Sequence, residues 1–244
     1  MKLKLIGLST VIFIADILVA QSDEGVRKFS TMELLPKVED QHTSWYTFLD
    51  EQTMSAAVFF LQSGKEDTAT RSYLDQVYYF LSGKAQLNVG DKMLSVATDS
   101  ITYVRAGTKH YFTDVSADIL AIVVTSKARS NASDTMVQSF SMHRIESLGK
   151  SNNVVWNPFL RRHSLVFGLY MMPLSTGGDS TQIHPIDEIN IVTMGSSKFS
   201  VDGKSMDIKR GDIVYVRKQQ GHYFYDLKSD LDVLILFETK SLQK

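Results

Sequence analysis

The chain reads Tyr103-Val104-Arg105, four residues, His110-Tyr111-Phe112 and, after one more residue, Asp114. It then reads Tyr215-Val216-Arg217, four residues, His222-Tyr223-Phe224 and Asp226, which is the same pattern at an offset of 112 in the numbering. The same offset relates further pairs: Asp75 and Asp187, Gly83 and Gly195, Val89 and Val201, Lys92 and Lys204, Ile101 and Ile213, Asp118 and Asp230. No gap is needed from 75 to 118, so the chain contains a duplication, and each copy is long enough to bury its own core.

From residue 54 onward, both copies have the pattern of short strands. Segments rich in β-branched and aromatic residues alternate with turn residues, as at Ser82-Gly83 and Val89-Gly90-Asp91 in the first copy. Met194-Gly195 and Val201-Asp202-Gly203 are the matching turns in the second copy. Many short strands with closely spaced turns predict an all-β fold, an antiparallel sandwich or barrel, in each copy.

The composition is that of a soluble globular protein. The 244 residues are 43% apolar and 22% charged, with 26 Lys and Arg against 27 Asp and Glu. The net charge of −1 and the lack of a basic run argue against a nucleic-acid partner.

The N-terminal segment 1–20 is predicted to be a signal peptide. Lys2 and Lys4 are followed by a mostly apolar run from Leu5 to Ala15, and the polar sequence resumes after Ala20, where we expect cleavage. The alternative is a membrane anchor, but the run is too short to span a bilayer and Asp16 interrupts it. We therefore expect an exported protein with no membrane attachment after cleavage. The absence of cysteine favours the bacterial periplasm or the extracellular space over a eukaryotic secretory pathway.

One motif carries the chemistry, and it lies in the second copy. Gly177-Gly178 is followed by Gln182, His184 and Glu188, then by Gly195, Gly211-Asp212, an apolar strand at 213–216 and His222. This arrangement resembles the cupin superfamily, whose first motif is a glycine, His-x-His, three or four residues, Glu and a later Gly. Its second motif is Gly-Asp, an apolar strand, usually Pro, and His. Here Gln182 stands where the first His is expected, and Arg217 replaces the Pro.

The resemblance covers both copies and implies a bicupin. The fold implied is two cupin-type antiparallel β-barrels, double-stranded jelly rolls, in tandem. With it we expect the following division of the chain: a signal peptide at 1–20, an N-terminal extension at 21–53, an N-terminal cupin at 54–130, a linker at 131–163 and a C-terminal cupin at 164–244.

The first copy lacks the residues that this resemblance assigns to a metal. Thr70, Ser72 and Gln76 stand at the positions of Gln182, His184 and Glu188, and of the histidines only His110 has a counterpart. One imidazole with hydroxyl and amide neighbours is a poor divalent-metal site, so we expect the N-terminal cupin to be metal-free.

The spacing of the candidate ligands in the second copy requires a bend in the chain. Gln182 and His184 are two residues apart and share one face of a strand, whereas His184 and Glu188 on a straight strand are about 13 Å apart. The chain must therefore bend between them, and Pro185 is placed where a bend fits. Two imidazoles and one carboxylate form the ligand set of non-haem iron sites, and they suit Mn, Zn, Ni or Co as well.

We accordingly predict a divalent metal ion held by His184, Glu188 and His222. Gln182 is expected to add a weak amide-oxygen ligand or to bind a metal-bound water, and Tyr223 is a candidate for substrate binding. The alternative for His222 is retention for the fold alone, because His110 occupies the equivalent place; His184 and Glu188 have no such equivalents.

Three functions compete at this stage. The first is an exported metalloenzyme acting on a small organic molecule, a dioxygenase or else an isomerase or lyase. The second is a non-catalytic cupin module that binds a sugar or small acid. The third is a structural or oligomerising cupin, and a homodimer is compatible with any of the three. The retained ligands favour the first function, while the missing first His and the Arg in place of Pro favour the others.

Overall fold

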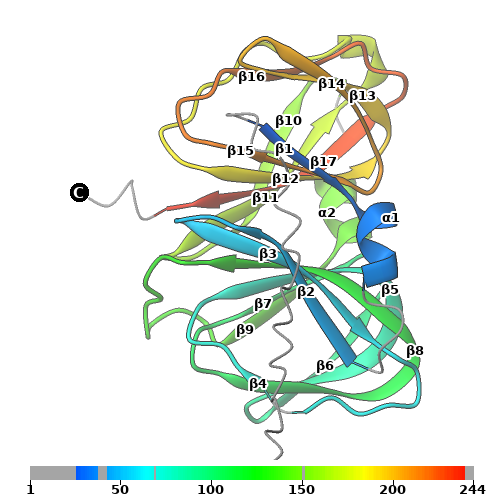
Figure 1. Cartoon of the computed structure of the whole chain (residues 1–244), viewed down its shortest axis with the longest axis vertical. Helices are drawn as coiled ribbons and strands as arrows, with labels where there is room; N and C mark the ends of the chain where they lie inside the picture. The colour runs from blue at the N-terminus through cyan, green and yellow to red at the C-terminus, as the bar shows by residue number, and fades with distance from the viewer. Residues whose placement is uncertain (1–25, 38–42, 69, 150–151, 240–244) are drawn as a thin grey trace, which may run out of the picture.

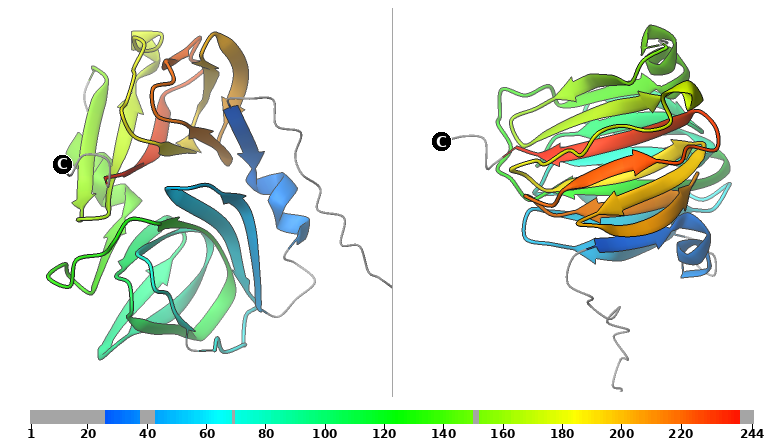
Figure 2. Two further views of the ribbon diagram at one scale, coloured as in Figure 1. Left: turned by 60° about the vertical axis from the view of Figure 1, so that its left-hand side comes forward. Right: turned by 90° about the horizontal axis from the view of Figure 1, so that it is seen from above.

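The computed structural model describes residues 26–37, 43–68, 70–149 and 152–239, and the predicted signal peptide lies outside these ranges. The described chain forms two stacked β lobes, each built from antiparallel strands (Figure 1, Figure 2). The first lobe contains β2 (Thr43–Asp50), β3 (Met54–Leu61), β4 (Thr70–Arg71), β5 (Gln76–Val89), β6 (Lys92–Ala97), β7 (Ser100–Val104), β8 (Lys109–Ser126) and β9 (Val137–Ser141). The second contains β1 (Val26–Ser30), β10 (Val155–Arg161), β11 (Leu165–Met172), β12 (Glu188–Met194), β13 (Ser196–Val201), β14 (Lys204–Lys209), β15 (Asp212–Val216), β16 (His222–Tyr225) and β17 (Leu231–Glu238).

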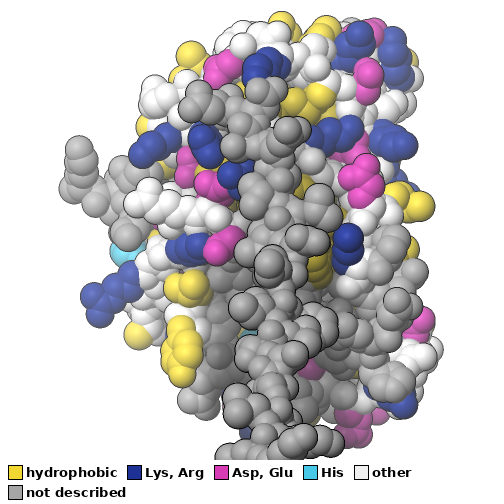
Figure 3. Space-filling view, in the orientation of Figure 1, with side chains coloured by type: hydrophobic (Ala, Val, Ile, Leu, Met, Phe, Trp, Pro, Cys, Tyr) yellow, Lys and Arg dark blue, Asp and Glu magenta, His cyan; other side chains and the backbone are white. Residues whose placement is uncertain are grey.

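Helical segments in the described chain are short. They are α1 (Thr31–Leu34), η1 (Leu35–Lys37), α2 (Met142–Gly149) and η2 (Leu174–Thr176). The all-β prediction is confirmed, and the described part of the chain has no helix long and apolar enough to cross a membrane. On the face shown in Figure 3, basic and acidic side chains lie among one another.

The two lobes have the same strand pairings. In the first lobe the sheet order is β2-β3-β8-β5-β7-β9, with β6 on β5 and β4 on β8. In the second, β1-β15-β12-β17-β11-β10 form one sheet and β14-β13-β16 another. The long strand β5 corresponds to β12 and β13 together, which separate at Gly195. Gly195 has φ of +82°, and a Cβ there would lie 2.1 Å from the Asp230 carbonyl oxygen, so only glycine fits this corner.

The constant offset between the copies holds in the strand register. Gln76 pairs with Val104 and Thr125, just as Glu188 pairs with Val216 and Phe237. Tyr103 and Tyr215 pair with Val77 and Ile189 at equivalent positions, as the repeat predicts. The duplication is therefore present in three dimensions.

The duplication also extends beyond the segments that the sequence pattern revealed. The β2–β3 pair has a register shift between Thr47 and Leu49, and the β10–β11 pair has the matching shift between Pro158 and Leu160, at an offset of 111 rather than 112. The boundaries expected at 53/54 and 163/164 fall in the turns that join β2 to β3 and β10 to β11, and so separate strands that pair with each other. The expected extension contributes β1 and β2, and the expected linker contributes β9 and β10. The physical reason is that the inner strands β3 and β11 need a partner on their outer edge.

The first strand of each copy pairs in the opposite lobe. Val26–Ser30 and Val137–Ser141 are equivalent segments, again at an offset of 111, and each leads into a helix, α1 or α2. Strand β1 pairs with β15 of the second copy, and β9 of the second copy pairs with β7 of the first. This reciprocal strand exchange ties the two lobes together.

Three apolar clusters form the core. One lies between the lobes and joins residues of both copies, including Tyr103, Ile122, Ile189 and Leu234, while the other two fill the lobe interiors. Matching polar contacts cross the interface: the Thr53 hydroxyl donates to Asp187 Oδ2 at 2.5 Å, and the Ser164 hydroxyl donates to Asp75. Burial of these aliphatic and aromatic side chains contributes about 1.5–3 kcal/mol each, which makes the interface a major source of stability.

Candidate metal centre

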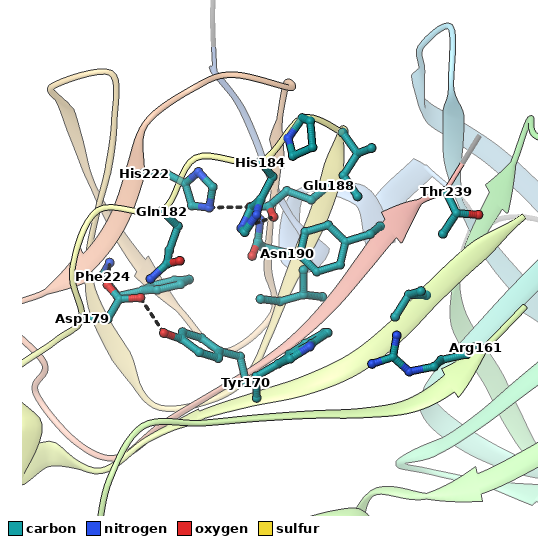
Figure 4. A pocket seen from close by; sticks show the side chains of 16 residues that line it. Arg161, Tyr170, Asp179, Gln182, His184, Glu188, Asn190, His222, Phe224 and Thr239 are labelled. Carbon is teal, nitrogen blue, oxygen red and sulfur yellow. Dashed lines mark hydrogen bonds and ion pairs between the residues drawn. The ribbon is translucent and has the colours of Figure 1, made fainter. Parts of the chain in front are cut away.

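Three ligand-type side chains from separate places in the sequence meet inside the second lobe. Glu188 begins β12, His222 begins β16 and His184 lies on the loop before β12. His222 Nε2 lies 3.0 Å from Glu188 Oε1, and His184 Nε2 lies 3.7 Å from Glu188 Oε2. One ligand atom from each of the three lies within 4.8 Å of the other two (Figure 4). The structure thus brings together the three residues that the sequence singled out.

The loop before β12 makes the bend that the spacing demands. Backbone hydrogen bonds link Gln182 and His222 in both directions, at 2.7 and 2.9 Å, and fix the loop against β16. The backbone N–H of Gln219 donates to the His184 carbonyl at 2.7 Å. These contacts bring His184 back over Glu188, so the two side chains share one site despite their separation along the chain.

Hydrogen bonding at the site leaves acceptors facing one another. His222 Nδ1 lies 3.0 Å from the Gln220 carbonyl, which can only accept, so Nδ1 carries a proton. In the neutral ring the lone pair of His222 Nε2 then faces Glu188 Oε1, which also accepts from Asn190 Nδ2 at 2.9 Å. Only a proton or a cation between the two atoms makes this contact favourable.

The second oxygen of Glu188 gives an independent test of whether a cation fits. Glu188 is 1% exposed, and its Oε2 has no hydrogen-bond partner, although a buried carboxylate oxygen left unpaired is costly. This oxygen faces His184 Nε2. A divalent ion bound by one oxygen and two imidazoles would remove both problems, so these residues fit a metal.

The two imidazoles differ in their electrostatics. Burial alone lowers the pKa of His222, but the hydrogen bond and negative charge of Glu188 outweigh it and hold the pKa above its ordinary value. Burial lowers the pKa of His184, and the nearby Glu188 offsets this only in part. His184 therefore presents a neutral imidazole at neutral pH, which is the form that binds a metal.

A cavity of about 470 Å³ opens beside the three residues. Its walls are largely apolar and aromatic, with polar groups at a few places (Figure 4). The lining consists of Trp156, Arg161, Val166, Tyr170, Asp179, Gln182, His184, Pro185, Ile186, Glu188, Asn190, His222, Phe224, Ile235, Phe237 and Thr239. This size and character are typical of a site for a small organic molecule.

The two remaining predicted residues, Gln182 and Tyr223, differ in their position relative to the cavity. Gln182 lines the cavity, where its Nε2 donates to the Ser180 carbonyl at 3.1 Å. Tyr223 does not line it, and the expectation that it contacts substrate is corrected by strand geometry. His222 and Phe224 on β16 are buried toward the cavity, so Tyr223 between them points to the other face, where its ring lies 5.4 Å from that of Tyr225.

Several cavity residues were not foreseen. Asn190 follows Glu188 by two positions on one strand, so alternation alone indicates that both face the cavity. Asp179 accepts from the Tyr170 hydroxyl at 2.8 Å and from the Phe224 N–H at 2.7 Å, and burial raises its pKa. Arg161 carried no signal, because its strand fell within the expected linker.

The equivalent position in the first lobe is closed by a tyrosine. Tyr78, the counterpart of Asn190, is 2% exposed, and its hydroxyl lies 2.8 Å from His110 Nε2. His110 Nδ1 faces the Thr108 carbonyl at 3.0 Å, so Nε2 accepts from the tyrosine hydroxyl, and burial lowers the pKa of His110. The Ser72 hydroxyl is turned to the backbone N–H of Leu74, and the side chain of Thr70 lies outside the described part.

No protein-family model matches the sequence. Over 87 residues the chain is 36% identical to Uncharacterized protein SCO3923 of Streptomyces coelicolor, which is 36% of this chain and 83% of that protein. The relative is therefore roughly as long as one of the two copies described above.

Solved structures share the fold over most of the chain. A cupin 2 conserved barrel domain protein from Leptotrichia buccalis matches with a TM-score of 0.70 and 14% identity, over 89% of this chain and 98% of that one. A salicylate 1,2-dioxygenase from Pseudaminobacter salicylatoxidans matches with a TM-score of 0.76 and 8% identity, over 89% and 86%. Its adduct with gentisate matches with a TM-score of 0.74 and 8% identity, over 92% and 86%. At these identities the likeness is one of fold.

Proposed function

This chain belongs to the family of the Streptomyces coelicolor relative and has the cupin fold, and we propose that it is a metal-dependent enzyme that acts on a small organic molecule as a dioxygenase. The observation that carries the proposal is the arrangement of Glu188 between His184 and His222 at the wall of a largely apolar cavity. Both carboxylate oxygens face imidazole nitrogens, and one of these oxygens has no hydrogen-bond partner.

The metal would be held by His184, Glu188 and His222, with Fe, Mn, Zn and Ni as candidates. When bound, such an ion supplies a Lewis acid with open positions at which a substrate oxygen and dioxygen can be brought together. Gln220 fixes the tautomer and orientation of His222 through its carbonyl, and Asn190 holds the Glu188 carboxylate.

The cavity walls account for binding and for exclusion of water. Phe224, Ile235 and Phe237 provide apolar surface beside the three ligand residues. The Tyr170 hydroxyl donates to Asp179, which also accepts from the backbone of Phe224, so the polar groups of this wall are hydrogen-bonded to one another. A ligand with an apolar body is favoured over a sugar, whose hydroxyl groups would need more polar partners than this wall offers.

The test is metal content followed by turnover. Protein purified without chelators and reconstituted with each candidate metal should retain about one ion per chain after desalting, measured by elemental analysis. Oxygen uptake should then be measured with gentisate and salicylate as the first substrates tried. Wild-type protein that retains no divalent ion at neutral pH would contradict the proposal.

The second candidate is a non-catalytic module that binds a small acid. The observation in its favour is Gln182, which stands where cupins have a further histidine and whose amide nitrogen is already bonded to the Ser180 carbonyl. A module of this kind would bind metal and ligand in a titration without consuming oxygen, whereas the enzyme consumes oxygen with at least one ligand that it binds.

Export is a separate part of the proposal. Its support is the sequence of residues 1–20, with two lysines before an apolar run and polar residues after Ala20. Expression of the full chain in a bacterial host should give a mature protein whose N-terminal sequence begins near Gln21 in the periplasmic or culture fraction. Recovery of intact Met1 in the membrane fraction would favour an anchor.

A further inference from the structure

One charged position differs between the two copies and bears on the ligand. In the first lobe Lys127 Nζ and Asp50 Oδ1 form an ion pair at 2.5 Å. Their counterparts in the second lobe are Thr239 and Arg161. The equivalence is structural, because the backbone N–H of Lys127 donates to the Thr53 carbonyl and that of Thr239 donates to the Ser164 carbonyl, the equivalent residue. An ion pair that neutralises itself in one copy is thus replaced by a single arginine in the other.

The side chain of Arg161 is an exposed positive charge at the edge of the cavity, with no counter-ion among the described residues. It lines the cavity together with Thr239 (Figure 4), and no acidic side chain in the described part of the chain pairs with it. The acidic groups of the cavity are already used: Asp179 accepts from Tyr170 and Phe224, and Glu188 faces the two imidazoles. Among the described lining residues, Arg161 is the only Lys or Arg.

Arg161 and Glu188 lie in one row across the same sheet. Arg161 pairs with Val166, Val166 pairs with Phe237, and Phe237 pairs with Glu188. Side chains in such a row point to the same face, and all four line the cavity. Three steps between strands separate the two ends by about 14 Å at the backbone. The long arginine side chain reaches into this span, and Val166 and Phe237 form an apolar floor between the charge and the ligand residues.

We propose that Arg161 binds the carboxylate of the substrate, and that the substrate is a small organic acid with an apolar, aromatic-sized body. The carboxylate pairs with the guanidinium, the body lies over Val166 and Phe237, and the far end reaches His184, Glu188 and His222. Guanidinium suits this role because its planar fork binds a carboxylate through two parallel hydrogen bonds. The inference rests on the proposed function, since it names the substrate class of the same site.

The experiment compares two probes that differ only by a carboxylate, gentisate and hydroquinone, by isothermal titration calorimetry. It uses wild-type protein and the variants Arg161→Gln, Arg161→Lys and Arg144→Gln, each with and without metal. Arg144 is an exposed residue of α2, so its variant removes the same charge away from the cavity. The double variant R161D/T239K installs the ion pair of the first lobe at the cavity and tests whether a self-neutralised pair abolishes acid binding.

Wild-type protein should bind gentisate at least about tenfold more tightly than hydroquinone, as expected for a charge-assisted pair. Arg161→Gln and R161D/T239K should remove this preference, Arg161→Lys should keep part of it, and Arg144→Gln should leave it unchanged. Hydroquinone affinity and metal content should be the same in all of them. Equal affinity for the two probes in wild-type protein, binding of neither probe, or an unchanged preference in Arg161→Gln would overturn the inference.

The two proposals fail separately. Loss of metal binding in wild-type protein with the Arg161-dependent preference intact would refute the metalloenzyme and leave the acid-binding cavity. Retention of the metal by a protein that ignores the carboxylate would refute only the role of Arg161.

Discussion

The interiors of the two lobes start from the same scaffold and end in opposite states. In the first lobe Tyr78 and Phe80 fill the space beside His110, within an aromatic cluster that includes Phe59 and Phe112. In the second lobe their counterparts are Asn190 and Val192, and a cavity of about 470 Å³ remains. Two changes of side-chain volume on one strand therefore accompany the difference between a packed core and an open cavity.

The chemistry of the retained histidine changes with the group that faces it. His110 Nε2 meets a tyrosine hydroxyl, which can donate to the lone pair of a neutral ring. His222 Nε2 meets Glu188, which only accepts and so requires a proton or a cation. The comparison teaches that one equivalent histidine packs against a tyrosine in one copy and faces a carboxylate, as a candidate metal ligand, in the other.

The largest expected effect separates the two histidine sites by metal content. His184→Ala should abolish retention of a divalent ion, because it removes one of two imidazoles that face Glu188. Elemental analysis should show the ion falling from about one per chain to none. His110→Ala is the matched control and should leave metal content unchanged. Loss of the ion in His110→Ala, with its retention in His184→Ala, would place the metal site in the first lobe instead.

The next effect is on folding stability, in the first lobe. Tyr78→Ala should lower the free energy of unfolding by about 3–5 kcal/mol, because it opens a void in a tightly packed aromatic cluster. Chemical denaturation followed by circular dichroism measures it. Asn190→Ala, the same truncation at the cavity, should cost far less. Similar losses in the two variants would show that the interiors do not differ in packing as the structure indicates.

Removal of one hydroxyl group tests the closed hydrogen bond on its own. Tyr78→Phe keeps the ring and removes the hydroxyl that lies 2.8 Å from His110 Nε2, so we expect a loss of about 1–3 kcal/mol in the free energy of unfolding. Tyr111→Phe, on the adjacent position of β8 and less buried, is the control for loss of a hydroxyl. A neutral Tyr78→Phe substitution would mean that the hydroxyl does not matter to the first lobe.

The smallest effect concerns Asp232, whose counterpart in the first lobe is Leu120. Burial, together with Glu146 and Asp230, raises the pKa of Asp232 from 3.8 to about 6. Since the folded pKa lies above the unfolded one, the folded state binds the proton more tightly, and the cost of ionisation is present in full above pH 6 and is relieved as the pH falls toward 4. Asp232→Asn should therefore stabilise the protein at pH 7 by about 1 kcal/mol, after allowance for solvent screening.

The measurement for Asp232 is the stability difference between variant and wild type as a function of pH. The advantage of the variant should shrink between pH 7 and pH 4, because the wild-type carboxyl is progressively protonated over that range. An advantage that grows on acidification would contradict the assigned pKa direction.

The duplication could be recognised in the sequence because both copies need the same residue types at certain positions. Gly83 and Gly195, and the strands around Tyr103 and Tyr215, keep a constant spacing because their backbone geometry is shared. The outer strands were missed because the spacing there is 111 rather than 112, so the offset of 112 does not align them. Trp45 and Trp156, Phe48 and Phe159, and Leu49 and Leu160 are identical pairs at that second spacing.

The candidate metal ligands could be identified from the sequence because their types and spacings are restrictive, whereas the cavity could not. Whether space remains beside His222 depends on the volumes of neighbouring side chains, and those neighbours come from five different strands. Strand alternation could have identified Asn190 and excluded Tyr223, since each lies one or two positions from a predicted ligand. The importance of Arg161 became apparent only from comparison with the Asp50–Lys127 ion pair at the equivalent positions of the first lobe. That comparison requires the structures of the two lobes to be aligned.

The reciprocal strand exchange has an evolutionary consequence. Two separate identical chains could exchange their first strands in the same way, but every substitution would then appear on both sides of the assembly. When the two copies are joined in one polypeptide, each lobe always exchanges its strand with a lobe of different sequence. A tyrosine that fills the interior of one lobe is then absent from the other. Substitutions can therefore accumulate in the cavity of one lobe while the other lobe keeps a packed interior.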